Sequence, residues 1–272
     1  MRAEDYDSSQ KGATWHGYDL EGITLDDCLM NGARLKNVDL SGARIRGAML
    51  VDVEISGEIQ NLTVNGVDVA PLVEAELDRR DPERTKMHPT DAAGFREAWE
   101  IVERRWAETV DRARQLDPDQ LHERVDGEWS FIETLRHLVF ATDAWIRRAL
   151  LGDPSPYSAL DLPHEDMAAP PGVVPNDAGA RPSLEEVLEL RRDRMATMRR
   201  VVDELTDEQL AEHTTAVEGP GYPASRSFPV AAVLHTILNE EWMHRQYAER
   251  DLAILEHHVP PPRPYTEQGT SS

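Results

Sequence analysis

The chain has 272 residues and a formal net charge of −22, because 51 acidic side chains outnumber 29 basic ones. This length exceeds the usual size of one hydrophobic core and predicts two domains. The acidic balance disfavours a nucleic-acid or anionic-membrane surface, since both need clustered Lys and Arg.

The cysteine count and the hydropathy of the chain further narrow the class of protein. Cys28 is the only cysteine, which excludes an intrachain disulfide framework. There is no apolar run of about 18 residues and no signal-type N-terminus, so we expect a cytoplasmic protein that does not enter a membrane.

Apolar residues recur every five positions through the N-terminal part of the chain. A five-residue step is neither a helix period nor a strand period, so it indicates an internal repeat that stacks along an axis. Two interleaved series carry the repeat: Tyr18, Ile23, Cys28, Ala33, Val38, Ala43, Ala48 and Val53, and Leu20, Leu25, Met30, Leu35, Leu40, Ile45, Leu50 and Ile55.

The phrases NGARL, NVDLS and GARIR in this segment resemble the pentapeptide-repeat family. The resemblance implies a right-handed quadrilateral β-helix in which both apolar series point inward. Cys28 is then a small core residue, with a reactive thiol as the alternative. The resemblance also implies that Asp39, Ser41, Arg44 and Arg46 face water. Two further units, at Leu62, Val64, Val67 and Val69, would follow a phase slip near Gly57 and complete a domain over residues 1–69.

A sharp change of composition follows the repeat. Residues 70–90 predict a short helix over about Pro71 to Arg79 and then a charged linker. Helical periodicity dominates from Asp91 onward, and Asp91 itself is a suitable N-cap for the first long helix. The second long helix begins near Trp129 and ends at Gly152.

The third long helix begins after Ser183, where SLEE matches a capping box, and runs to about Leu205. A fourth covers Pro229 to Glu256 with an apolar stripe at three- and four-residue steps. Residues 153–182 form a long proline-rich crossover, which in a compact domain usually has a function. Four long helices with one crossover predict a four-helix bundle over residues 91–258, followed by a disordered tail at 259–272.

Two phrases in these helices, EWSFIETLRHLVFATDAW and LNEEWMHRQYAERDL, resemble the DinB/YfiT-like superfamily. That superfamily includes mycothiol-dependent maleylpyruvate isomerase and related thiol-dependent S-transferases. The resemblance implies a divalent metal held by a His on the second helix and by two residues four apart on the last. The matching residues are His137, Glu240 and His244, with Glu in place of the first His of a His-x3-His pair.

The residue chemistry agrees with that assignment. Glu240 and His244 lie one helical turn apart beside an apolar stripe, where a carboxylate without a partner costs several kcal/mol. Two imidazoles and one carboxylate leave an open coordination position, as catalytic zinc sites do. Zinc is the first expectation, and nickel, iron and manganese accept the same donors. The alternative is that Glu240 and His244 are an ordinary i, i+4 pair on a half-buried helix face, with His137 as a solvated boundary residue.

Several other histidine and aromatic residues have both a functional and a structural interpretation. His235 lies about half a turn out of phase with His244. His164 falls in the crossover and His213 in a second loop, from about Ala211 to Phe228, where each either reaches a substrate or is simply solvated. EEWMH is not the zinc-protease motif, because Glu241 faces about 100° away from the pair. Trp129, Trp145, Trp242 and Tyr247 line a pocket or belong to the core.

Two classes of function follow from these features. The first is a metal- and thiol-dependent transferase or isomerase that acts on a small molecule, with the crossover closing over the site. The second is a non-catalytic binding or scaffold protein that uses the repeat surface, with a structural metal or none in the bundle. A homodimer is compatible with either.

Overall fold

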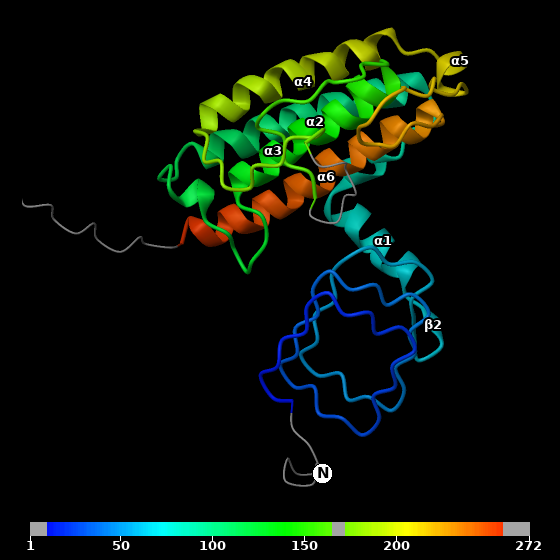
Figure 1. Ribbon diagram of the computed structural model, residues 1–272. Helices are drawn as coiled ribbons and strands as arrows, with labels where there is room; N and C mark the ends of the chain where they lie inside the picture. The colour runs from blue at the N-terminus through cyan, green and yellow to red at the C-terminus, as the bar shows by residue number, and fades with distance from the viewer. Residues whose placement is uncertain (1–9, 165–171, 258–272) are drawn as a thin grey trace, which may run out of the picture. The chain divides into compact units, whose positions relative to one another are not determined.

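The computed structural model describes residues 10–164 and 172–257 (Figure 1). The chain divides into two compact units between Glu58 and Ile59, whereas the sequence placed the end of the repeat domain at residue 69. The expected disordered tail at 259–272 lies outside the described residues.

The N-terminal unit is built from turns spaced along the five-residue repeat. Backbone hydrogen bonds of 2.9–3.0 Å close turns every ten residues, one of them from Ala33 N to Met30 O. Midway between these turns the backbone takes positive φ at Gly17, Asp27, Asn37 and Gly47. Gly, Asn and Asp tolerate that left-handed conformation best. The chain therefore bends every five residues, and Figure 1 shows the bends as the corners of an open coil.

The interior expected for this coil does not form. All described residues from 10 to 58 are exposed, and no strand is assigned among them. Leu20 is 41% exposed and Ile45 70%, although both belong to the series expected to face a core. The expectation of a buried interior containing Cys28 is therefore wrong, since the Cys28 side chain is exposed too. The hydrogen bonds that close the turns span three residues each, so they do not draw neighbouring coils into contact.

Residues 62–69 form a hairpin rather than two more repeat units. β1 (Thr63–Val64) pairs antiparallel with β2 (Val67–Asp68), with Val64 opposite Val67. The connecting Asn65 and Gly66 both have positive φ, 51° and 81°. Two such residues make the tight turn that matches strand twist, and Asn-Gly is its preferred sequence. This turn chemistry outweighs the continuing five-residue spacing.

Short helices lead from the hairpin into the long helices. α1 (Ala70–Arg80) and the 3-10 helix η2 (Pro82–Met87) precede α2 (Ala92–Ala113). The side chain of Asp91 accepts a hydrogen bond from Gly94 N at 2.7 Å, so the predicted N-cap is confirmed. A 3-10 helix, η3 (Gln120–His122), then leads toward the second long helix.

The second long helix has two parts. α3 (Phe131–Ala141) begins at a capping box in which Ser130 and Glu133 exchange hydrogen bonds. It continues without a break as a π-helix, η4 (Thr142–Leu150), where the turns are wider. The sequence predicted one continuous α-helix here, so the wide turns are a correction to it.

The remaining helices follow their predicted ranges closely. α4 (Leu184–Glu204) begins at the Ser183–Glu186 capping box, and a short α5 (Asp207–Leu210) follows it. α6 (Val230–Leu255) begins directly after Pro229. Crossover residues 151–164 and 172–183 carry no helix or strand, as their proline content suggested.

The four long helices pack side by side (Figure 1). α2 packs against α4 and α6, and α3 packs against the same two helices. The core between them is large and apolar, with Phe95, Trp99, Leu135, Leu234 and Ile237 almost fully buried. Because α3 and α6 are neighbours, side chains on their facing sides meet. None of the helices in the described residues combines the length and apolarity that crossing a bilayer requires.

Candidate metal centre

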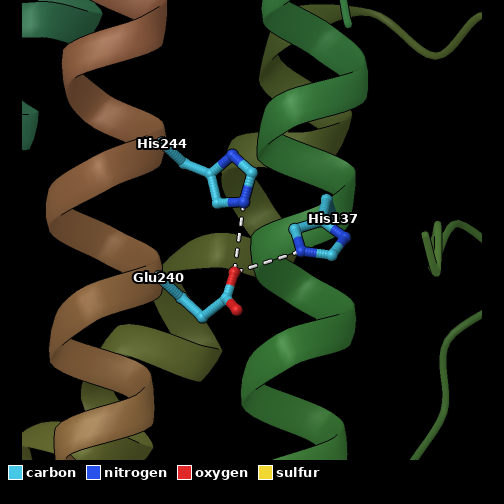
Figure 2. Close-up of side chains that lie close together, drawn as sticks. All are labelled: His137, Glu240 and His244. Atoms are coloured by element: carbon cyan, nitrogen blue, oxygen red, sulfur yellow. Dashed lines mark hydrogen bonds and ion pairs between the residues drawn. The ribbon is translucent and has the colours of Figure 1, made fainter. Parts of the chain in front are cut away.

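His137 on α3 meets Glu240 and His244 on α6 (Figure 2). The carboxylate oxygen Oε2 of Glu240 lies 3.2 Å from His137 Nε2 and 3.1 Å from His244 Nε2. The three ligand atoms all lie within 4.8 Å of one another. Within the described part of the chain, this is the one cluster of three or more such side chains with metal-site spacing. The structure thus brings together the three residues that the sequence singled out.

The cluster is withdrawn from solvent. The His137 side chain is 4% exposed, that of His244 19% and that of Glu240 25%. Burial alone would raise the pKa of the Glu240 carboxyl. Contacts with the imidazoles of His137 and His244, when these rings carry the shared proton, outweigh burial and lower that pKa to about 2. Glu240 is therefore a carboxylate at neutral pH.

A backbone carbonyl from the crossover sets the tautomer of His137. Leu162 O lies 3.0 Å from His137 Nδ1. A carbonyl oxygen only accepts hydrogen bonds, so Nδ1 carries the proton and the Nε2 of a neutral ring has a free lone pair. That lone pair faces the ionised Glu240. Two acceptor atoms at this distance need a proton or a cation between them.

The two spacings from Glu240 to the imidazole nitrogens suit a metal ion. Typical bonds from zinc to His nitrogen and carboxylate oxygen put neighbouring ligand atoms of a tetrahedral site about 3.3–3.4 Å apart. The two contacts from Glu240 are 3.1 and 3.2 Å, close to that value. Neutral imidazoles and one carboxylate also match the donor types of catalytic zinc sites. The residues present therefore fit a divalent ion with at least one position open.

Aromatic rings form the wall of the site. The Trp129 ring centroid lies 4.6 Å from that of His137 and 5.9 Å from that of His244, on which it stacks. Phe140 lies 6.0 Å from His137, and Tyr247 lies 5.9 Å from His244. These rings cover part of the ligand side chains, and His137 is the most deeply covered of the three. Trp129 and Tyr247 thus line the site, as one interpretation of the sequence had it.

The other two aromatic candidates lie elsewhere. Trp145 packs against Tyr222 and Phe228, with ring centroids 6.0 and 5.3 Å away. Trp242 is 5% exposed and belongs to the main hydrophobic core. For these two residues the interpretation as core is the correct one.

Only one further histidine reaches this wall in the described residues. His164, on the crossover, lies 5.6 Å from the Trp129 ring, centroid to centroid. His235 packs on Phe95 at 4.9 Å, and burial lowers the pKa of its imidazole. His213 is exposed and pairs through its backbone with Pro229. Of the two loop histidines, His164 is therefore the one placed near the candidate ligands.

Glu241, the neighbour of Glu240, has a different partner. Its two carboxylate oxygens accept hydrogen bonds of 2.7 and 2.8 Å from Arg191 on α4. Both side chains are almost fully buried, and the Arg191 guanidinium lies 5.4 Å from the Trp106 ring centroid. Glu241 is thus neutralised inside the bundle and is not a candidate ligand, as its helical phase predicted.

Sequence reasoning missed the contributions of the crossover. Leu162 acts through its carbonyl, which every residue has, so no residue-type signal could identify it. Arg136 is fully buried and holds the same stretch of backbone, and its only signal is a charged residue inside an apolar helix face. Asp161 is also fully buried, and neither of its carboxylate oxygens has a hydrogen-bond partner. Burial and the nearby Asp143 raise the pKa of its carboxyl to about 8.

The fold and the site define a helical bundle with a candidate metal centre between two neighbouring helices. Comparison with known families places it: the model of the DinB superfamily matches residues 101–248, more than half of the 272-residue chain. The chain belongs to the DinB superfamily. The model of pentapeptide repeats matches eight copies over residues 19–57. No curated protein and no solved structure matches the chain.

Proposed function

We propose that the bundle binds a divalent metal ion through His137, Glu240 and His244, and that the chain is a metal-dependent enzyme. Its reaction would be an S-transfer or isomerisation that uses a low-molecular-weight thiol, such as mycothiol, on a small-molecule substrate. The observation that carries the proposal is the position of Glu240 Oε2, in contact with two imidazole nitrogens at 3.1 and 3.2 Å. Membership of the DinB superfamily supports it.

The side chains of the site have separable roles in this proposal. Glu240 supplies the negative charge that an ion needs, and its low pKa keeps that charge at neutral pH. The Leu162 carbonyl holds the Nδ1 proton of His137, so that Nε2 is left as a donor atom. Trp129 and Phe140 keep bulk water from the ligands. An ion bound there would lower the pKa of a thiol, so that thiolate is available at neutral pH.

Metal binding is tested with protein stripped by a chelator and then titrated with Zn²⁺ or Co²⁺. We expect one ion per chain in the wild type, and loss of binding in Glu240→Gln and His137→Ala. His235→Ala is the matched control, because His235 is on the same helix but packs on Phe95. Co²⁺ should also quench the fluorescence of Trp129, and this part of the quenching should vanish in Trp129→Phe. A wild-type chain that retains no stoichiometric ion contradicts the proposal.

The thiol is tested separately from the metal. Loaded protein is incubated with a panel of thiols and electrophilic or cis-unsaturated acids, and consumption of free thiol and formation of isomer are followed. We expect turnover with at least one thiol that disappears in Glu240→Gln. Binding of an ion without turnover across the panel would keep the metal site and remove the thiol-dependent reaction.

The exposed repeat favours a second candidate, a binding or scaffold protein. For residues 10–58 we propose the right-handed quadrilateral β-helix that the family resemblance implies, supported by a bend every five residues. That fold would require closer stacking of the coils than the structure has, with burial of apolar side chains that are exposed here. In that role any metal would be structural, so stripping it would unfold the bundle. Circular dichroism of the stripped full-length chain separates the candidates: retained helicity favours the enzyme, and lost helicity favours a structural site. Amide exchange on the same chain tests the β-helix, which requires slow exchange through residues 19–57.

A further inference from the structure

A buried arginine next to His137 holds both sides of the crossover. Arg136 is fully buried and donates three hydrogen bonds to backbone carbonyls. Its Nε donates to Leu160 O at 2.9 Å, its Nη2 to Asp177 O at 2.7 Å and its Nη1 to Ala180 O at 3.3 Å. The first acceptor precedes the middle of the crossover and the other two follow it. One guanidinium therefore ties two distant stretches of loop to α3.

The stretch tied by Arg136 is the one that contacts the candidate metal centre. Leu162 is 4% exposed, and its carbonyl oxygen accepts a hydrogen bond from Nδ1 of His137, 3.0 Å away. Two residues further along, His164 lies against Trp129, whose ring also contacts His137 and His244. Consecutive residues of α3 thus bind carbonyls two residues apart in the crossover. Any shift of Leu160 would move Leu162 as well.

We propose that Arg136 is a positioning residue for the metal centre. By fixing Leu160, it holds the Leu162 carbonyl where it accepts from Nδ1 of His137 and leaves Nε2 for the ion. This inference rests on the proposed function for its metal, but the orientation and tautomer of His137 belong to the chain itself. Partners that orient a ligating histidine typically change metal affinity by about 10–100-fold when they are removed.

Arginine suits this role better than lysine would. Its planar fork presents five N–H donors in fixed directions, so one side chain reaches three carbonyls at once. An ammonium group is a compact charge on a flexible stem and does not reproduce that geometry. All three acceptors here are neutral carbonyls, so the guanidinium donates these hydrogen bonds to the loop backbone rather than to a carboxylate.

Arg148 provides a matched control. It is 1% exposed and likewise donates to loop carbonyls, including Pro154 O at 2.7 Å and Gly219 O at 2.8 Å. A methyl group added at Gly221 would lie 2.6 Å from its Cζ, so this guanidinium is closely surrounded too. Its hydrogen bonds go to Pro154, Val217, Gly219 and Pro223, and not to residues 160–162. Arg136→Met and Arg148→Met therefore remove similar buried donors at different places.

The experiment uses the full-length chain, stripped of metal and titrated with Zn²⁺ alone against a competing chelator. We expect Arg136→Met to bind Zn²⁺ about 10–100-fold more weakly than the wild type, and Arg148→Met to bind within about threefold of it. A second readout is the ¹⁵N chemical shifts of the His137 ring in the metal-free chain. These should show the Nδ1–H tautomer in the wild type and in Arg148→Met, and a mixture of tautomers in Arg136→Met.

Each outcome has a defined meaning. Equal Zn²⁺ affinity of Arg136→Met and wild type, or equal weakening by both variants, overturns the positioning role. A wild type that binds no Zn²⁺ removes the proposed function, and the tautomer readout then decides the role of Arg136 alone. Far-UV circular dichroism checks that each variant is folded. If Arg136→Met is not, Arg136→Lys, which keeps the charge but not the fork, is judged by the same two criteria.

Discussion

Two adjacent carboxylates of α6 face two different regions of the bundle. Glu241 points to α4 and forms a two-pronged ion pair with Arg191. Glu240 points to α3, and within the described part of the chain its polar contacts are with two imidazoles. Both are withdrawn from solvent, but only Glu241 has a permanent cation. The charge of a buried carboxylate that is paired with a fixed arginine is already neutralised. A carboxylate held by two histidines is instead suited to binding an exchangeable cation.

The side of the bundle built on α4 repeats the first pattern. Arg194 on α4 donates to both carboxylate oxygens of Asp143 on η4, at 3.0 and 2.7 Å, and both side chains are buried. The side between α3 and α6 has the histidines and the crossover carbonyl instead. The difference teaches that the buried carboxylates beside α4 are paired with arginines, whereas Glu240 between α3 and α6 is held by imidazoles alone.

The largest expected effect separates the two carboxylates. Glu241→Gln leaves Arg191 as a buried charge without its partner, and we expect a loss of about 3–5 kcal/mol in the free energy of unfolding. Its Zn²⁺ affinity should stay near that of the wild type. Glu240→Gln should lose less stability than Glu241→Gln but should no longer bind Zn²⁺. Urea unfolding of the metal-free variants, together with Zn²⁺ titration, checks both halves. Similar losses of stability would erase the distinction.

Asp161 gives a pH dependence with a definite sign. Because the pKa of its carboxyl is raised to about 8 in the folded chain, the folded state keeps a proton that the unfolded state releases near pH 4. Its contribution to stability is complete below about pH 4 and is lost as pH rises toward 8.

Urea unfolding at pH 5, 6 and 7 should show this loss. We expect the free energy of unfolding to fall by up to about 1.4 kcal/mol per pH unit more in the wild type than in Asp161→Asn. Parallel pH profiles for the two proteins would show that Asp161 is ionised in the folded state.

Metal binding should itself stabilise the side between α3 and α6. At a free Zn²⁺ concentration 100 times its dissociation constant, an ion that binds only the folded chain adds about 2.7 kcal/mol to stability. The gain should be absent in His244→Gln and present in His235→Ala. Thermal unfolding with and without Zn²⁺ measures it, and a gain that persists in His244→Gln would place the ion elsewhere.

The smallest effects concern the helix caps, one on each side. Ser130→Ala and Ser183→Ala each remove a side-chain cap from a capping box, at the start of α3 and of α4. Each should cost about 1 kcal/mol of stability. Neither residue contacts the candidate ligands, so Zn²⁺ affinity should change less than twofold in both. A large change in affinity for Ser130→Ala alone would show that the site depends on how α3 begins.

Much of the bundle could be predicted from the sequence because its signals are local. Asp91 and Ser183 are typical N-cap residues and predict where two helices begin. The structure confirms both N-caps. Glu240 and His244 share a face because they are four residues apart. Their meeting with His137 was not a local inference, since it joins residues 103 positions apart. It came from resemblance to a family whose membership the comparison now shows.

The errors arise where two physical signals compete. Five-residue spacing continued past Gly57, but Asn65 and Gly66 favour a tight hairpin turn, and the hairpin formed. Apolar spacing through Thr142–Leu150 was typical of an α-helix, but wider π turns formed there. One alternative puts His137 at a solvated boundary, yet its side chain is only 4% exposed because crossover residues cover it. Burial by a loop produces no periodic pattern of apolar residues, so the sequence does not reveal it.

The candidate ligands come from only two helices, and these lie far apart along the chain. An ion shared by His137 and Glu240 would act as a reversible tie across 103 residues, much as a covalent cross-link of that span would. α3 and α6 could not separate without releasing it. The lifetime of the intact bundle would then follow the rate at which the ion leaves, so a chelator would act on the kinetics of unfolding as well as on any reaction.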